Sequence, residues 1–184
     1  MSQANPSPHP SAPTYDAIVL GGGAAGLMCA LTAGARGRRV ALVEHMPEVG
    51  KKILISGGGR CNFTNLEVRP DRFLSANPHF AKSALSRYTQ WDFISLVSEH
   101  AIAWHEKTLG QLFCDQSARQ IVDLLLKECA EAGVDVLTSA PVRSVERAQE
   151  PDGGFTVRTD SRTLTAPSVV LATGGPSIPK LGAT

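Results

Sequence analysis

The sequence predicts an α/β fold in which helices connect the strands of a parallel sheet. Two observations indicate it. An apolar run at residues 15–20 enters the turn Gly21–Gly26, and a helical stretch and a second apolar run at residues 39–44 follow. Strand, turn, helix and strand in this order form a βαβ unit, whose crossover makes the two strands parallel. A third apolar run, residues 168–173, again leads into glycines and predicts a further strand of the same sheet.

The other elements follow from periodicity and from capping residues. Helical spacing over residues 24–36 ends at Gly37, and Ser117 can cap a helix that runs through Ala132 and ends at Gly133. In chain order, we further expect a loop over 50–65, a mostly helical stretch over 78–101, a hairpin over 102–114, a strand over 134–137, and a small antiparallel sheet from 142–148, 155–159 and 163–165. The candidate core residues of the stretch 78–101 are Phe80, Leu85, Tyr88, Trp91, Ile94 and Leu96.

Composition narrows the classes of protein. The 184 residues suffice for one domain, which we expect over 15–184, after a disordered, proline-rich tail over 1–14. A net charge of +1 does not indicate the excess of positive charge that is typical of proteins that bind nucleic acid or an anionic membrane. The four cysteines have no paired spacing, and the N-terminus has no pattern of a targeting signal. We therefore expect a reduced, cytoplasmic protein without a nucleic-acid or membrane partner.

The first glycine cluster has the spacing of a dinucleotide-binding turn. Gly21 permits a tight turn, Gly23 lets the backbone approach a pyrophosphate, and Gly26 lets the helix pack close to the strand. The N–H groups at the helix start, including those of Ala24 and Ala25, can receive phosphate oxygens. Glu44 lies 18 residues beyond Gly26 at the end of the second strand. There its carboxylate can accept hydrogen bonds from a ribose diol and would repel a 2′-phosphate.

Two further glycine clusters lie where the chain can approach a ligand. Gly57–Gly59 is followed by Arg60, whose guanidinium suits phosphate, and by Asn62, while Lys52 adds positive charge nearby. Ala172, Thr173 and Gly174 follow the last strand, at the sheet edge where open α/β sheets bind ligands.

Three segments carry a resemblance to a known family. They are DAIVLGGGAAGLMCALTAGARGRRVALVE, GKKILISGGGRCNFTN and SVVLATGGPSIPKLG. With them the chain resembles the YhiN-like family of FAD-dependent oxidoreductases, also called BaiN-like or aminoacetone-oxidase-like, and GGGRCNFTN is the most specific of the three. The resemblance implies a Rossmann-like FAD-binding domain of the two-dinucleotide-binding-domain type.

The resemblance also implies roles for individual residues. The first segment would hold the ADP half of FAD, the GGGRCN loop would lie along the cofactor, and Val142 would give backbone contacts near the adenine. The corner formed by Ala172, Thr173 and Gly174 would close beside the dinucleotide. Cys114 stands where relatives commonly have proline. Family members are longer, so the chain resembles their N-terminal part, without the inserted second domain and the C-terminal return.

The function that the resemblance implies is hydride transfer from NAD(P)H through FAD to an unknown small-molecule acceptor. Two alternatives remain: an NAD-dependent dehydrogenase domain, which fits Gly21–Gly26 and Glu44 equally well, and a non-catalytic dinucleotide-binding fragment. No side chain is assigned as a general acid or base. Cys61 as a redox thiol is a further hypothesis. His100 and His105 do not have the spacing of a metal site, and we expect none.

Overall fold

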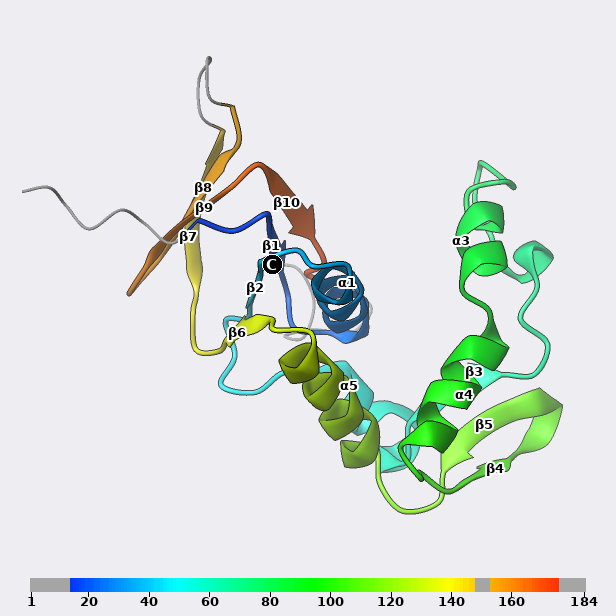
Figure 1. Cartoon of the computed structure of the whole chain (residues 1–184). Coiled ribbons are helices and arrows are strands. Elements are labelled where there is room, and N and C mark those ends of the chain that lie inside the picture. The colour runs from blue at the N-terminus through cyan, green and yellow to red at the C-terminus, as the bar shows by residue number, and fades with distance from the viewer. Residues whose placement is uncertain (1–13, 148–152, 176–184) are drawn as a thin grey trace, which may run out of the picture. The chain divides into compact units, whose positions relative to one another are not determined.

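A computed structural model describes residues 14–147 and 153–175. The chain divides into two compact units: unit 1 comprises Met1–Val49 and Cys129–Thr184, and unit 2 comprises Gly50–Glu128. Figure 1 labels their elements. Each unit is described by itself below.

Unit 1 contains the predicted parallel sheet. Its strands are β1 (Ala17–Leu20), β2 (Val40–Val43), β6 (Asp135–Leu137) and β10 (Ser168–Leu171), in the order β10-β1-β2-β6. Every pair is parallel, with Ile18 opposite both Ala41 and Val169. The central strands are buried on both faces, which explains their continuous apolar sequences. The prediction of a parallel sheet is confirmed.

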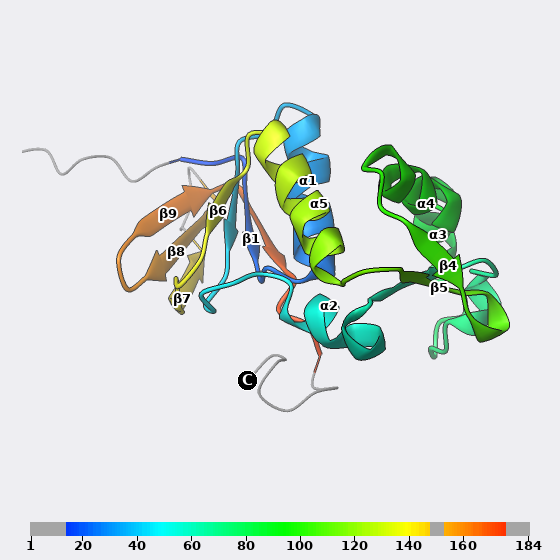
Figure 2. The ribbon, with the colours of Figure 1, turned by 90° about the horizontal axis from the view of Figure 1, so that it is seen from below.

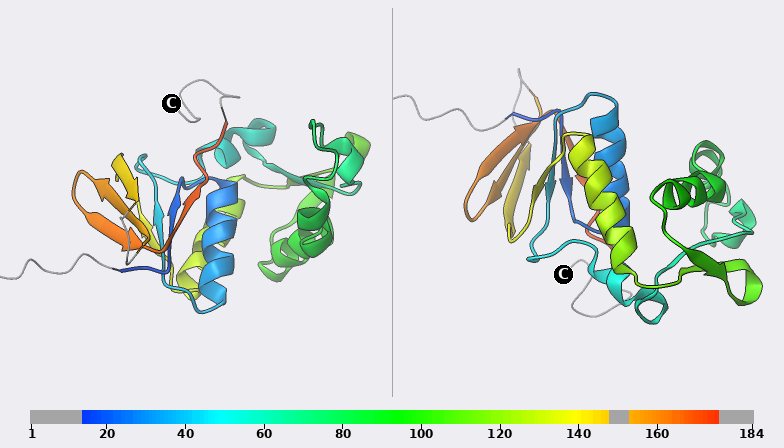
Figure 3. Two further views of the ribbon diagram at one scale, coloured as in Figure 1. Left: turned by 90° about the horizontal axis from the view of Figure 1, so that it is seen from above. Right: turned by 60° about the horizontal axis from the view of Figure 1, so that its bottom comes forward.

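A helix and a second sheet cover the two faces of this parallel sheet (Figures 2 and 3). On one face lies α1 (Ala24–Ala35), and the Cys129 thiol, near the end of α5 (Arg119–Glu131), donates to the Leu27 carbonyl at 3.7 Å. On the other face lies the predicted antiparallel sheet of β7 (Val142–Arg147), β8 (Phe155–Thr159) and β9 (Thr163–Ala166). Between the two sheets lies an apolar core made by Tyr15, Ile18, Leu20, Ala41, Val43, Ala140, Val157, Leu164 and Ala166.

Unit 2 is built around a small antiparallel sheet. Its strands β3 (Asn62–Asn65), β5 (Gln111–Cys114) and β4 (Trp104–Glu106) follow one another in the order β3-β5-β4. Phe63 on β3 contacts the rings of Phe93 and Trp104 at centroid distances of 6.0 and 6.4 Å. The other elements are the helices α2 (Lys51–Ile55), α3 (Lys82–Arg87), α4 (Gln90–Glu99) and the first part of α5, with the 3-10 turns η1 (Ser56–Gly59), η2 (Pro70–Arg72) and η3 (Thr108–Gly110).

Two local predictions in unit 2 are corrected. The segment 50–65 is not a loop throughout, because Ile53 is buried and anchors the short helix α2, and Asn62–Asn65 pairs with β5. The stretch 78–101 is mostly helical, as predicted, and holds two helices, because Tyr88 is extended (φ −142°, ψ 105°) and Thr89 starts a new one; only its candidate core is corrected. Of its candidate core residues, Ile94 is buried, whereas the side chains of Phe80, Tyr88 and Trp91 are exposed.

The chain ends lie mostly outside the described residues. The tail predicted over 1–14 is described only at Thr14, which bridges Thr165. The single domain predicted over 15–184 stays a prediction. Among the described residues, no helix is both long enough and apolar enough to cross a bilayer.

Candidate functional site

The glycine turn of unit 1 joins the carboxyl end of β1 to the start of α1. Gly21 has a φ of +109°, and its N–H donates to the Val43 carbonyl at 2.8 Å, which ties the turn to the end of β2. A side chain at Gly21 would meet the Ala172 carbonyl oxygen at 2.4 Å, and one at Gly26 would meet the Gly21 carbonyl oxygen at 1.9 Å. Gly21 and Gly26 are therefore required by close backbone packing, as their spacing predicts.

Gly23 has a different reason to be glycine. Its backbone is extended (φ −83°, ψ −175°), and no atom lies within 4 Å of the position that a Cβ would occupy. The space beside Gly23 is thus left open by the protein, which is the condition for a ligand to approach the backbone.

The N-terminus of α1 is available for an anion. Gly23 is its N-cap residue and provides no side-chain cap, and the first turn contains no acidic residue. The first four N–H groups of a helix have no acceptor within the helix. Ala24 and Ala25, at the first two positions, are exposed. The helix start therefore offers exposed donors at the positive end of the helix dipole, which fits the pyrophosphate of a dinucleotide.

Glu44 follows β2 and is the only buried charged residue among the described ones, with 8% of its surface exposed. Its Oε2 accepts from the Gly22 N–H at 2.7 Å, and its Oε1 accepts from the Met46 N–H at 2.8 Å. His45 Nδ1 lies 2.9 Å from the same Oε1. The carboxylate thus fixes the glycine turn, a role that the sequence did not reveal. A carboxylate has about four lone-pair positions, so an acceptor position remains for a ribose hydroxyl.

Two other sequence-predicted segments lie against this turn. The Ala172 N–H donates to the Leu20 carbonyl at 2.8 Å, which places the corner formed by Ala172, Thr173 and Gly174 beside Gly21. The Ala140 N–H donates to the Glu44 carbonyl at 2.9 Å, and Val142 starts β7 two residues further on. Unit 1 therefore brings the glycine turn, Glu44 and the corner at residues 172–174 together at the carboxyl ends of parallel strands, the usual position of ligands in open α/β sheets.

The glycine loop of unit 2 has an unusual backbone. Gly57, Gly58 and Gly59 have φ values of +58°, +66° and +86°, and the next but one residue, Cys61, has +52°. The loop is held by the Gly59 carbonyl, which accepts from Ala118 at 2.7 Å, and by the Arg60 carbonyl, which accepts from Cys114 at 2.9 Å. The successive left-handed residues explain why this loop is made of glycine.

Three predicted cofactor residues lie in unit 2. Arg60 and Asn62 are exposed on either side of the buried Cys61, and Lys52 is half-buried in α2. The structure thus presents the guanidinium of Arg60 and the amide of Asn62 to solvent. Their binding roles, like those of the residues in unit 1, stay predictions.

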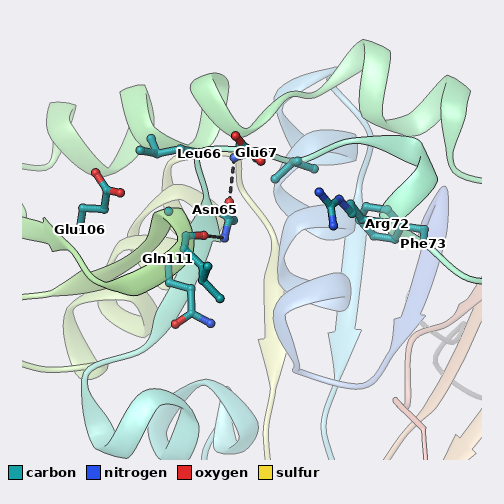
Figure 4. Close-up of a pocket in the computed structure, with 10 residues that line it drawn as sticks. Asn65, Leu66, Glu67, Arg72, Phe73, Glu106 and Gln111 are labelled. Atoms are coloured by element: carbon teal, nitrogen blue, oxygen red, sulfur yellow. Dashed lines mark hydrogen bonds between the residues drawn. The ribbon is translucent and has the colours of Figure 1, made fainter.

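Unit 2 also contains an open cavity of about 700 Å³ between η2 and the turn of the β4–β5 hairpin. On its lining, the Asn65 amide links two backbone segments. Its Nδ2 donates to the Leu109 carbonyl at 2.8 Å, and its Oδ1 accepts from the Glu67 N–H at 2.7 Å. Figure 4 shows Arg72 and Glu106 at opposite ends of this cavity. Its charged groups do not converge on one point, and we assign it no ligand. Within residues 14–147 and 153–175, no three His, Cys, Asp or Glu side chains cluster as in a metal site.

Comparison with protein families gives a match over residues 15–184 to the family described as "HI0933-like protein Rossmann domain". The chain belongs to this family. The resemblance noted in the sequence and the predicted α/β fold, a Rossmann-like domain with a parallel sheet and a small antiparallel sheet, are confirmed.

Among curated proteins, the chain is 55% identical to the ribosomal RNA dihydrouridine synthase of Escherichia coli over 92% of its own length. It is 51% identical to the protein of the same name in Haemophilus influenzae over 91% of its length. It is 28% identical to the 3-dehydro-bile acid delta(4,6)-reductase of Clostridium scindens over 89% of its length. The chain spans 42%, 42% and 40% of the lengths of these relatives.

Among solved structures, the fold is similar to that of the 3-ketosteroid-delta4-(5alpha)-dehydrogenase of Rhodococcus jostii, with a TM-score of 0.62 and 14% identity. That match covers 89% of this chain and 46% of the dehydrogenase. THI4 of Thermovibrio ammonificans matches with a TM-score of 0.58 and 17% identity, over 89% of this chain and 58% of that one. At these identities the matches show the fold.

Proposed function

We propose that the chain is the FAD-binding part of a flavoprotein oxidoreductase. The observation that carries this proposal is the uncapped start of α1, where the open space beside Gly23 meets exposed N–H groups, next to Glu44 and the corner at residues 172–174. These residues fit a dinucleotide: the helix start can hold the pyrophosphate, and Glu44 can accept from a ribose hydroxyl. Membership of the family and the GGGRCN loop favour FAD over NAD.

When bound, FAD would supply two-electron chemistry. The chain's own contribution would be to hold the cofactor. In unit 1, the α1 N–H groups would neutralise the diphosphate, and the backbone at Val142 would contact the adenine. No side chain is assigned to proton transfer.

For the acceptor, we propose a uracil base of ribosomal RNA, with NAD(P)H as the electron donor. The support is the sequence identity of 55% and 51% to two relatives named ribosomal RNA dihydrouridine synthase. Formation of dihydrouridine from uridine adds two hydrogen atoms across one carbon–carbon double bond, which matches the transfer of a hydride and a proton. The alternative is a small-molecule acceptor, favoured by the net charge of +1 and by the relative named as a bile acid reductase.

Cofactor identity is tested by purifying the chain and denaturing it. We expect a yellow protein that releases FAD, and a colourless protein that binds NAD would favour the dehydrogenase alternative. Gly23→Val should weaken FAD binding at least about tenfold, because the side chain fills the open space, with at most a small change in melting temperature. Ala35→Val, an exposed change at the other end of α1, is the matched control and should leave FAD binding unchanged.

The acceptor is tested by incubating the FAD-loaded chain with NADH or NADPH and a ribosomal RNA transcript. We expect uridine nucleosides that are heavier by about 2 Da, the mass of two hydrogen atoms. Oxidation of NAD(P)H by small enones but not by RNA would favour the small-molecule alternative. FAD binding without any NAD(P)H-dependent electron transfer would favour the non-catalytic fragment.

A further inference from the structure

Two cysteines that are far apart in the sequence lie side by side in unit 2. Cys61 immediately precedes β3, and Cys114 is the last residue of β5. These strands pair in the antiparallel ladder, with Asn62 opposite Phe113. The Cys114 N–H donates to the Arg60 carbonyl at 2.9 Å. The two chain neighbours of Cys61 therefore contact β5: Asn62 lies opposite Phe113, and Arg60 binds Cys114.

This position puts the two cysteines within the range of a disulfide. The Cys114 N–H binds the peptide carbonyl that directly precedes Cys61, so the two backbones adjoin at this point, and disulfides join cysteines whose Cα atoms are about 4.4–6.8 Å apart. Cys61 and Cys114 are both buried, with 5% and 0% of their surfaces exposed, so both side chains point into the protein. Both are free thiols in this structure.

The thiols also interact electrostatically. Burial, and after it the Cys61 thiol and Asp115, together raise the pKa of the Cys114 thiol to about 11. Burial likewise raises the pKa of Cys61, while a hydrogen bond from Ser56 opposes this rise. Cys61 is thus one of the groups close enough to Cys114 to raise its pKa.

We propose that Cys61 and Cys114 form a reversible disulfide when the chain meets an oxidised low-molecular-weight disulfide such as oxidised glutathione. In the first step the Cys61 thiolate attacks one sulfur of the oxidant, which forms a mixed disulfide and releases one glutathione thiolate. In the second step the Cys114 thiolate attacks the Cys61 sulfur and releases the second glutathione thiolate. The two protons lost by the cysteines go to the two released thiolates, and the oxidant is reduced to two glutathione molecules.

Cys61 would attack first because it is the more exposed of the two thiols. The product would join the Gly57–Asn62 loop covalently to β5. Because this loop belongs to the GGGRCN segment, oxidation would fix the backbone that presents Arg60 and Asn62.

The test is peptide mapping of the whole chain after treatment with oxidised glutathione. Trypsin cleaves after Arg60 and Lys107 and releases Cys61 within residues 61–72 and Cys114 within residues 108–119. We expect these two peptides joined, with a loss of about 2 Da, and separated again by dithiothreitol. Joined peptides that carry Cys29 or Cys129 instead, or no joined peptides at any oxidant concentration, would overturn the proposal.

Single variants test the order of the steps. Cys114→Ser should accumulate glutathione on Cys61, whereas Cys61→Ser should leave Cys114 unmodified. Cys29→Ser, in α1, is the control and should form the cross-link like the wild type. The rate of cross-linking should rise about tenfold per pH unit between pH 7 and pH 9, because the thiolate fraction rises in this way below the pKa. Glutathione on both cysteines without a cross-link would contradict the pairing, and this outcome can be read in the wild type.

Discussion

Helix α4 of unit 2 and helix α1 of unit 1 begin in opposite ways. In unit 2, α4 starts at Thr89, whose hydroxyl accepts from the Asp92 N–H at 3.4 Å, while the Asp92 carboxylate accepts from the Thr89 N–H at 2.6 Å. This reciprocal capping box satisfies the donors at the start of the helix with the protein's own side chains. In unit 1, α1 starts at Gly23 without any side-chain cap. The difference separates a helix start that the protein's own side chains cap from one that has no side-chain cap and to which the proposed function assigns a ligand.

The energetic consequences differ in the same way. Around α1, the glycine turn is held by backbone packing and by the buried Glu44, and the helix start itself adds little. Around α4, the cap is local and exposed, and it stabilises one helix. Substitutions at the α1 turn should therefore either disrupt the fold or affect ligand binding alone, whereas substitutions at the α4 cap should change stability moderately.

The largest effect is expected for Gly26→Ala. The new methyl group would lie 1.9 Å from the Gly21 carbonyl oxygen, which is a backbone atom and cannot move aside like the end of a flexible side chain. We expect a loss of about 3 kcal/mol or more in the free energy of unfolding, measured by urea denaturation. Gly133→Ala is the control, since Gly133 has a φ of +68° but no atom within 4 Å of a Cβ, and it should lose only about 1 kcal/mol. Equal losses in the two variants would mean that close packing does not hold the turn.

The next effect is expected for Glu44→Ala. Removing the carboxylate leaves the buried N–H group of Gly22 and the part-buried N–H group of Met46 without their acceptor. The free energy of unfolding should fall by about 2 kcal/mol in the absence of any ligand. Glu44→Gln keeps the shape and one oxygen and should lose less. If both variants unfold like the wild type but bind FAD weakly, Glu44 serves the ligand and not the turn.

The sequence predicted the parts of the fold whose causes are local. The strands β1, β2 and β10 are continuous apolar runs, and Gly37 and Gly133 end their helices with φ values of +75° and +68°. The start of α4 was missed although a signal was present: Thr89 is followed three residues later by an acid. The strand β3 was missed because its stability comes from pairing with β5, far along the chain.

In the candidate site, too, features with local causes could be predicted from the sequence, and contacts between distant residues could not. The packing roles of Gly21 and Gly26 could be inferred from the spacing of the motif. The bond between Glu44 and the Gly22 N–H joins residues 22 positions apart, and no sequence pattern distinguishes it from a ribose contact. The nearness of Cys61 and Cys114 was equally hidden, because it depends on the register of β3 with β5.

A moderate effect is expected at the capped helix. Thr89→Ala removes the hydroxyl that accepts from the Asp92 N–H, and the free energy of unfolding should fall by about 1 kcal/mol. Thr89→Ser retains the hydroxyl and should stay within a few tenths of a kcal/mol of the wild type. FAD binding should be the same in all three proteins when it is measured by fluorescence titration. A loss of FAD affinity in Thr89→Ala alone would contradict the claim that the start of α4 contributes to stability and not to FAD binding.

The smallest change in stability is expected where the two helix starts are made alike. Gly23→Ser gives α1 a hydroxyl that can accept from its own first-turn N–H groups, and the extended backbone at this position accommodates serine. The free energy of unfolding should rise by about 0.3 kcal/mol, since glycine is only slightly poorer than serine as an N-cap. FAD affinity should fall about fivefold, because the hydroxyl competes for donors that the diphosphate would use. If FAD uses the N–H groups at the start of α1, Gly23→Ser should raise the free energy of unfolding and lower the affinity for FAD. A rise in both would mean that FAD does not use the start of α1.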